Sequence, residues 1–250
     1  VIRPRPEFAS QGSLELKSET RMQLLVTIVP VKRCSLAKQR LSAVLNADER
    51  SVLTTTMFHD VMRAIKALRS DTHPLVVTAD DDVAAIARGY GAEVMPDRWE
   101  EGITRAVLEA TTAMSDRGFD TAMIIPADVP LVLPSELRDL VQTHANCGIT
   151  IVPSDSDQGT NAIIASPPTA ITFSYGPNSF VRHLNQVRQT GLRTQVIHLP
   201  GLNLDVDRPS DLVRVLASER STWTKAFLST LDRKRLDPCL ACEMPPLPWL

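Results

Sequence analysis

LLVTIVPVKRCSLAKQR, residues 24–40, is the stretch that decides the fold class. Its first eight residues, 24–31, are a run of mainly apolar side chains, which is typical of a strand buried on both faces. The segments that follow, 35–45 and 47–68, carry apolar residues at helical spacing. A buried strand followed by helices is the repeating unit of an α/β fold.

The same alternation continues along the chain. We expect further strands at 74–79, 92–97, 121–131, 148–155, 160–166 and 193–199, and helices at 81–91, 99–114, 135–144, 179–189 and after Pro209. Strands that alternate with helices imply right-handed crossovers and a mostly parallel sheet covered on both faces. The sequence therefore predicts a single-domain, Rossmann-like α/β fold.

The helix expected at 47–68 carries a regular apolar stripe. Its members recur every three or four residues and so lie on one face: Leu53, Met57, Val61, Ile65 and Leu68. We interpret this stripe as core packing and not as a cofactor site.

Length and charge narrow the classes of function. The chain has 250 residues, of which 43% are apolar, enough to bury one sizeable core. Lys and Arg number 27 against 29 Asp and Glu, and the formal charge of −2 argues against an overall basic field that would hold nucleic acid. No run approaches the roughly 18 apolar residues of a membrane span, and the N-terminus lacks an apolar signal core. We therefore expect a cytoplasmic protein with no nucleic-acid or membrane partner; a homodimer is possible.

The two ends differ from the middle of the chain. We expect 1–21 to be a disordered extension, because it is polar and has no sustained period, and the domain to span 22–217. The segment 218–250 should contain a helix and then a proline-rich tail. The apolar face of that helix would be Trp223, Phe227, Leu228 and Leu231.

Four cysteines, Cys34, Cys147, Cys239 and Cys242, do not make a disulfide framework in a chain of this length, so we expect free thiols. Cys239 and Cys242 could supply half a zinc site. No second pair or nearby histidine accompanies them, which favours free thiols there too.

Ligands of open α/β sheets bind beyond the carboxyl ends of the strands, so polar residues that follow apolar runs are candidates for a site. After the first strand come Lys32, Lys38 and Arg40, which could bind nucleotide phosphates beside a helix N-terminus. A solvated basic helix is an equally common explanation, and no glycine-rich P-loop is present.

Aspartates follow two later runs. Asp128 follows the apolar run of 121–125, while Asp205 and Asp207 are two residues apart and so point to one side of an extended chain. Three such carboxylates would suit a Mg²⁺ site with oxygen ligands only, in which phosphates and water supply the remaining ligands. The alternative is that Asp128 caps a turn or helix, Asp207 caps the next helix and Asp205 is solvated.

A last pair of segments, SDSDQGTNA and FSYGPNSF, offers backbone donors and hydroxyls in tight turns. Thr160, Gly176 and Ser179 could bind a phosphate or carboxylate without adding charge. Ser179 could also be the N-cap of the helix that follows, and the two roles are compatible.

In order, the motifs IVPVK…AKQRLS, ADVPL, DQGTNAI, FSYGPNSFVRH and LDVDRPSDL resemble those of the phospholactate and phosphoenolpyruvate guanylyltransferases of coenzyme F-420 biosynthesis. The resemblance covers about Gln23 to Leu216 and implies a nucleotide-diphospho-sugar transferase fold, with 22–217 as the guanylyltransferase domain. It implies that Mg²⁺ is held by Asp128, Asp205 and Asp207, and that the phosphorylated acid binds to Thr160, Gly176 and Ser179.

Three features depart from the family pattern. Ala127 replaces the glycine before the metal aspartate, Gly102-Ile103-Thr104 replaces a glycine-leucine-asparagine stretch, and 155–159 has fewer glycines than is usual.

The resemblance implies that the chain joins the GMP of GTP to a phosphorylated three-carbon acid: phosphoenolpyruvate, 2-phospho-L-lactate or 3-phospho-D-glycerate. A phosphate oxygen of the acid would attack the α-phosphorus and release pyrophosphate. A phosphate monoester is largely dianionic at neutral pH, so no general base is needed. Lys32, Lys38 and Asp128 would be the catalytic residues, and we interpret His183 as a helix-surface residue.

Two other functions stay open at this point. One is a molybdopterin guanylyl- or cytidylyltransferase of the same fold, which would carry a glycine-rich loop where this chain has PVKRCSLAK. The other is a nucleotide-binding regulatory domain without catalysis, against which the retention of all three acids argues.

Overall fold

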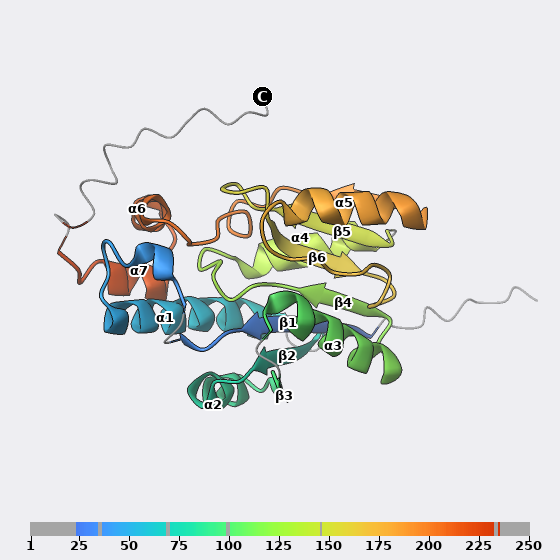
Figure 1. Cartoon of the computed structure of the whole chain (residues 1–250), viewed down its shortest axis with the longest axis horizontal. Coiled ribbons are helices and arrows are strands. Elements are labelled where there is room, and N and C mark those ends of the chain that lie inside the picture. The colour runs from blue at the N-terminus through green and yellow to red at the C-terminus, as the bar shows by residue number, and fades with distance from the viewer. Residues whose placement is uncertain are drawn as a thin grey trace, which may run out of the picture.

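The computed structural model describes residues 24–34, 37–68, 71–98, 101–145, 147–232 and 235. Within them, a seven-stranded sheet is covered by helices (Figure 1). The strands are β1 (Leu25–Val31), β2 (His73–Thr78), β3 (Glu93–Pro96), β4 (Thr121–Ile124), β5 (Ile149–Pro153), β6 (Thr160–Ala165) and β7 (Thr194–Val196). The α-helices are α1 (Ala47–Lys66), α2 (Asp81–Gly89), α3 (Ile103–Asp116), α4 (Pro134–His144), α5 (Ser179–Thr190), α6 (Pro209–Ala217) and α7 (Trp223–Leu228).

The sheet has the order β3-β2-β1-β4-β6-β5-β7 and is mostly parallel, as the alternation of strands and helices predicts. Strand β6 is the exception, because it runs antiparallel to both β4 and β5. The connection from β5 to β6 spans only 154–159 and is closed by the Ser154 N–H donating to Gly159 O at 2.9 Å. So short a link joins antiparallel strands, whereas a parallel pair needs a crossover.

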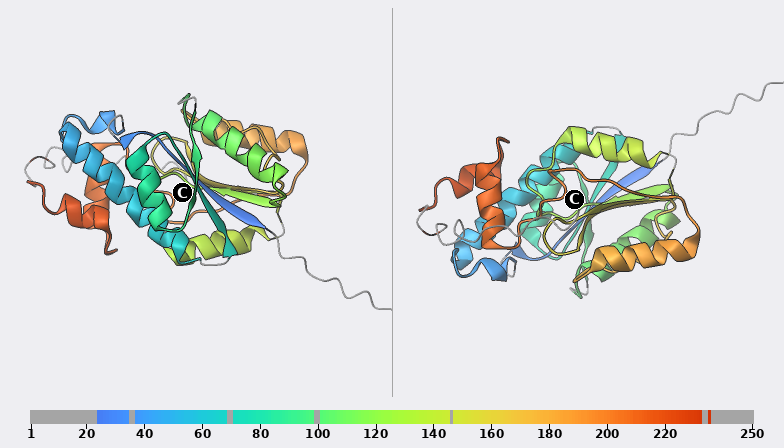
Figure 2. Two further views of the ribbon diagram at one scale, coloured as in Figure 1. Left: turned by 90° about the horizontal axis from the view of Figure 1, so that it is seen from below. Right: turned by 90° about the horizontal axis from the view of Figure 1, so that it is seen from above.

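Helices lie on both sides of the sheet (Figure 2). One apolar core joins the sheet to α1, α2 and α4, and a second joins its other face to α3 and α5. The stripe predicted on α1 is confirmed, because Leu53, Met57, Val61, Ile65 and Leu68 are all buried. Helix α1 begins with a capping box between Asn46 and Glu49, which satisfies backbone donors of its first turn.

The expected helix at 35–45 is wrong in its extent. The described part of this segment contains only a short 3-10 helix, η2 (Gln39–Leu41), preceded by Lys38 in the left-handed region at φ 55°. A non-glycine residue in that region interrupts helical geometry. Helix α3 likewise starts at Ile103, after Gly102 at φ 102°, and not at Trp99, which lies outside the described residues.

The helix predicted near the C-terminus is present as α7 and packs on α1, beside α6 (Figure 1). The buried carboxylate of Asp60 in α1 accepts hydrogen bonds from the Trp223 N–H, the Thr224 N–H and the Thr224 hydroxyl, at 2.8–2.9 Å. Leu228 is buried, whereas Trp223 is 48% exposed. The packed unit therefore extends past Ala217 to include α7.

Residues 1–23 and 236–250 lie outside the described residues, and with them the expectations for both extensions and for Cys239 and Cys242. Of the described cysteines, Cys34 and Cys147 are free thiols, as predicted. None of the described helices combines the length and the apolar character that crossing a bilayer requires.

Candidate active site

A cavity of about 380 Å³ opens at the carboxyl ends of β1, β2 and β4. Its walls include Lys32 after β1, Val77 of β2, Asp128 after β4 and Ile103 at the start of α3. Parallel strands bring their carboxyl ends to one edge of the sheet, so segments far apart in sequence meet there.

The two aspartate segments lie side by side at this edge. The Val206 N–H donates to the Asp128 backbone carbonyl at 2.9 Å, which holds the chain of 205–207 against the turn after β4. Asp128 and Asp207 both line the cavity. Asp205 is not among the lining residues, so the structure brings two of the three carboxylates that the sequence singles out to the cavity.

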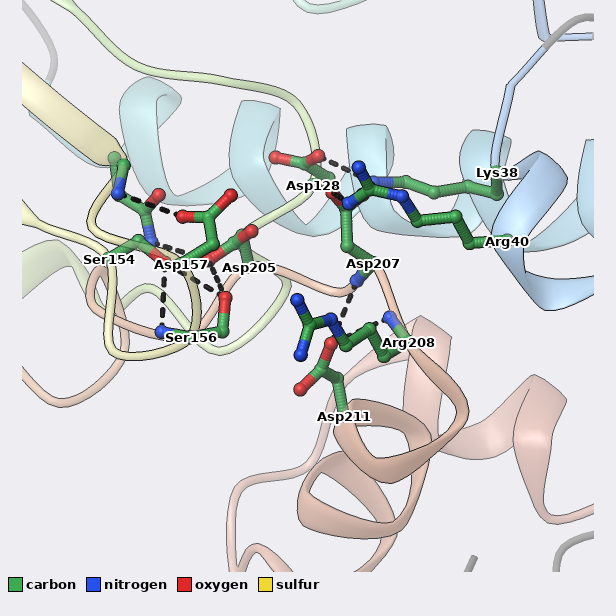
Figure 3. Close-up of polar contacts among 12 residues, drawn as sticks. Lys38, Arg40, Asp128, Ser154, Ser156, Asp157, Asp205, Asp207, Arg208 and Asp211 are labelled. Carbon is green, nitrogen blue, oxygen red and sulfur yellow. Dashed lines mark hydrogen bonds and ion pairs between the residues drawn. The ribbon is translucent and has the colours of Figure 1, made fainter. Parts of the chain in front are cut away.

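The ammonium of Lys38 lies between two of these carboxylates (Figure 3). Its Nζ is 2.5 Å from Asp128 Oδ2 and 2.7 Å from Asp207 Oδ1, and its side chain is only 8% exposed. Burial alone would lower the pKa of Lys38, but attraction to Asp128 and Asp207 raises it well above its usual value. Lys38 therefore stays charged and partly neutralises the carboxylates.

The pKa values of the two carboxylates beside Lys38 are shifted in opposite directions. Burial raises the pKa of Asp128, and the charges of Asp205 and Asp207 add to that rise against the pull of Lys38. Burial also acts to raise the pKa of Asp207, but Lys38 and then Arg40 bring it below its usual range. The Arg40 guanidinium is 3.4 Å from Asp207 Oδ2 and is mostly exposed.

Asp205 is held differently from its neighbours (Figure 3). Its Oδ1 accepts from Ser154 Oγ at 2.7 Å, Asn161 Nδ2 at 3.1 Å and Ser156 Oγ at 3.4 Å. Ser154 begins the β5–β6 connection and Asn161 follows it in β6, so this loop is tied to the carboxylate edge. Neither residue was singled out from the sequence, where isolated Ser and Asn carry no distinguishing signal.

The oxygen chemistry of this edge fits Mg²⁺, a hard cation that prefers carboxylates. Oδ1 of Asp128 is buried and has no hydrogen-bond partner among the described residues, as expected for an atom that awaits a ligand. Within the same residues, however, no group of three His, Cys, Asp or Glu side chains is already arranged to hold a metal ion. The magnesium assignment to Asp128, Asp205 and Asp207 stays a prediction.

The basic residues take different positions around the cavity. Lys32 and Lys38 line it, as a phosphate-binding role requires. Arg40 is not among the lining residues and contacts the site through Asp207.

Thr160, Gly176 and Ser179 form a second cluster around the start of α5, which does not line the cavity. Gly176 is at φ 105°, where a side chain would be strained, and its carbonyl accepts from the Ser179 N–H at 3.1 Å. The N-cap alternative for Ser179 is wrong: Asn178 occupies the cap position and Ser179 is the first helical residue.

One contact and one chain connection join this cluster to the cavity edge. The Tyr175 N–H donates to Thr104 Oγ1 at 3.0 Å, next to the cavity-lining Ile103. Thr160 precedes Asn161, which donates to Asp205. The threonine that departs from the family pattern at Thr104 therefore supports the loop of Gly176.

The interpretation of His183 as a surface residue is wrong. His183 is fully buried, with Nδ1 2.9 Å from Thr160 Oγ1 and Nε2 2.9 Å from the Ser174 backbone nitrogen. Burial, and then the charge of Arg182, lower its pKa to about 4. The spacing of Phe180, His183 and Val187 at i, i+3 and i+7 could have placed it on the inner face of α5.

A family model described as "Guanylyl transferase CofC like" matches residues 25–236, nearly the whole described region. The chain belongs to this family. It is 35% identical over 189 residues to the phosphoenolpyruvate guanylyltransferase of Sphaerobacter thermophilus, covering 75% of this chain and 90% of the relative.

Two other relatives bear the names of different acids. The 3-phospho-D-glycerate guanylyltransferase of Colwellia psychrerythraea is 32% identical over 185 residues, covering 74% of this chain and 88% of the relative. The 2-phospho-L-lactate guanylyltransferase of Methanothermobacter thermautotrophicus is 30% identical over 204 residues, covering 82% and 89% respectively.

A solved structure from Desulfovibrio desulfuricans G20, described as a nucleotide-diphospho-sugar transferase, superposes with a TM-score of 0.71 at 16% identity. The match covers 87% of this chain and 99% of that one. The fold predicted for this guanylyltransferase family member is thus confirmed.

Proposed function

We propose that the protein transfers GMP from GTP to the phosphate of a three-carbon acid and releases pyrophosphate, as a step of coenzyme F-420 biosynthesis. One observation carries the proposal: in a member of a guanylyltransferase family, a lysine and two aspartates meet in the wall of a cavity at the carboxyl ends of the strands. This arrangement of fixed charge is suited to phosphate chemistry.

The residues of the site divide the task. Lys32 and Lys38 provide positive charge on the cavity wall for the phosphates of GTP, with Arg40 at the outer side of Asp207. Asp128, Asp205 and Asp207 would hold Mg²⁺, which when bound neutralises charge on the phosphates. No base is required, because the acceptor phosphate is already largely dianionic at neutral pH.

Thr160, Gly176 and Ser179 would bind the phosphorylated acid, from the segments that flank the N-terminus of α5. They contribute two hydroxyls and backbone groups, which suit an acid whose charge is already matched by the cations of the cavity. The enzyme would act in the cytoplasm, where nucleoside triphosphates are available, and the homodimer stays a prediction.

The identity of the acid is the open part of the proposal, because the relatives are named for three different acids. The test is a matrix of GTP, ATP and CTP against phosphoenolpyruvate, 2-phospho-L-lactate and 3-phospho-D-glycerate, with Mg²⁺ present and pyrophosphate release measured. We expect turnover with GTP and one of the acids. Turnover with CTP or ATP in preference to GTP, or none with any acid, would overturn the proposal.

A further inference from the structure

Helix α5 presents two neighbouring side chains to the segment 174–177. The Arg182 guanidinium donates to Ser174 Oγ, to the Ser174 and Tyr175 carbonyls, and to the Pro177 carbonyl. His183 lies beneath the same segment and contacts Thr160 on β6. The start of β6 and the loop of Gly176 are thus joined through one imidazole.

The contacts of the imidazole fix its tautomer. The Ser174 backbone N–H can only donate, so Nε2 of His183 must be the unprotonated acceptor at 2.9 Å. In a neutral ring the proton is then on Nδ1, which donates to Thr160 Oγ1 at 2.9 Å. The low pKa of about 4 keeps the ring neutral at physiological pH.

This tautomer in turn fixes the role of the Thr160 hydroxyl. Its oxygen accepts the hydrogen bond from His183 Nδ1–H, so its own O–H is left to donate to another group. Among the described residues, Thr160 Oγ1 has no other hydrogen-bond partner than His183. The hydroxyl belongs to the cluster that we assign to the phosphorylated acid.

We propose that His183 is a positioning residue, which holds the Thr160 hydroxyl as a hydrogen-bond donor toward the phosphorylated acid. The inference rests on the proposed function for the identity of the ligand, but the tautomer and the hydroxyl orientation are properties of the free protein. An anionic acid oxygen accepts such a hydrogen bond, and a donor that is already oriented loses less freedom on binding.

A second buried histidine provides a matched control. His144 lies at the other end of β6, where Nδ1 is 3.0 Å from Thr150 Oγ1 and Nε2 is 2.9 Å from Ser166 Oγ. Ser166 Oγ also contacts Thr121 Oγ1 at 2.6 Å, so that hydroxyl is occupied within the protein. His144 has the burial of His183 without its proximity to the site.

The tautomer is tested first, by ¹⁵N NMR of the imidazoles in the full chain at neutral pH, with the His183→Asn variant used for assignment. We expect a single neutral form of His183, protonated on Nδ1. Protonation on Nε2, or a mixture of tautomers, would overturn the inference whatever the activity of the enzyme.

The kinetic test compares His183→Leu, His183→Asn and His144→Leu. We expect His183→Leu to raise KM for the acid about 10-fold, the size of one hydrogen bond to a charged group, with KM for GTP unchanged. Asn keeps an amide N–H near the place of Nδ1 and should restore part of the loss. His144→Leu should lower the melting temperature but leave KM for the acid unchanged.

A double-mutant cycle separates positioning from a general structural role. In a Thr160→Val background the hydroxyl is absent, so His183→Leu should have no further effect on KM for the acid. Additive effects, or a parallel rise in KM for GTP, would overturn the inference. Absence of turnover in the unmutated enzyme would refute the proposed function instead, and the NMR result would still decide the role of His183.

Discussion

The side-chain nitrogen of Lys38 lies 2.7 Å from Oδ1 of Asp207, although 169 residues separate the two in sequence. Lys38 has a left-handed backbone at the start of η2, and its side-chain nitrogen also contacts Asp128 Oδ2 at 2.5 Å. A cation of the protein thus already lies beside the oxygens that we propose for Mg²⁺.

Replacement of this lysine should therefore separate metal binding from turnover. In Lys38→Met, Asp128 and Asp207 lose their counter-charge, so the affinity for Mg²⁺ without nucleotide should rise about 10-fold, equivalent to ~1.4 kcal/mol. The kcat should fall by roughly 100-fold, because a cation at the phosphates is lost. Calorimetric titration of Mg²⁺ and steady-state kinetics measure the two effects. Arg40→Gln is the control, because Arg40 is exposed and its contact with Asp207 is longer, so the Mg²⁺ affinity and kcat should both change less. Weaker Mg²⁺ binding in Lys38→Met would contradict the assignment.

The three carboxylates should be individually required. Asp128→Asn, Asp205→Asn and Asp207→Asn each remove an anionic oxygen ligand, so each should lower kcat by at least about 100-fold while the circular dichroism spectrum is unchanged. Asp120→Asn is the control, since the Asp120 carboxylate accepts a hydrogen bond from the Leu24 N–H at the opposite end of the sheet. Near-normal rates and unchanged Mg²⁺ dependence in two of the three variants would refute the metal site.

Substitution of Gly176 should both destabilise the protein and weaken binding of the acid. Gly176→Ala places a side chain at φ 105°, which costs about 1 kcal/mol of stability, and Gly191→Ala at φ 69° on the other end of α5 should cost a similar amount. Only Gly176→Ala should also raise KM for the acid, because its backbone must approach the ligand. Urea unfolding and kinetics with the acid varied distinguish the two. Equal kinetic effects in both variants would remove Gly176 from the acid site.

Helix α7 should be needed for stability, whereas the residues after 237 should not. Truncation after Ala217 removes the buried Leu228 and so exposes the apolar residues that pack against it. It also leaves the Asp60 carboxylate without three hydrogen bonds, each of which contributes ~1.5–3 kcal/mol. We expect this variant to unfold at a much lower temperature, and deletion of 238–250 to leave the melting temperature unchanged. A stable protein that ends at Ala217 would show that α7 contributes little.

Acid should destabilise the protein partly through its buried histidines. The folded pKa of both His144 and His183 is about 4, below the ~6.5 of an exposed histidine, so the unfolded chain binds more protons between these values. Their contribution to stability is complete above pH ~6.5 and is lost as the pH falls toward 4. Free energies of unfolding at pH 7 and pH 5 should differ less in His144→Asn than in the parent. An unchanged difference would refute the buried neutral state.

The sequence predicts the strands and α1 because burial imposes continuous apolar runs on the strands and a helical period on α1. The stripe from Leu53 to Leu68 repeats every three or four residues, and the carboxylate of Asp128 follows an apolar strand directly. Each of these features depends on local spacing, so each could be recognised without the structure. Asp128 lies just past a strand end, where sites of open α/β sheets form, whereas 205–207 lies outside any strand and meets it through the Val206–Asp128 backbone hydrogen bond.

Features that depend on contacts distant in sequence could not be predicted in the same way. The interruption of 35–45 coincides with the left-handed backbone of Lys38, whose side chain pairs with Asp128 and Asp207, and no local pattern encodes these distant contacts. The antiparallel direction of β6 follows from a connection that the alternation of strands and helices does not distinguish. His183 was misplaced because its polarity outweighed the spacing of its apolar neighbours.

The backbone hydrogen bond between Val206 and Asp128 has a consequence for how such an enzyme can change its acceptor. It joins the two segments that carry the carboxylates, whereas the hydroxyl and the turn assigned to the acid are carried by β6 and the start of α5. Substitutions in 174–177 can therefore reshape the acceptor pocket while the nucleotide half keeps its geometry, whereas 155–159 contains Ser156, which donates to Asp205. We expect acceptor preference to be transferable between family members by exchange of 174–177, with little change in the Mg²⁺ requirement.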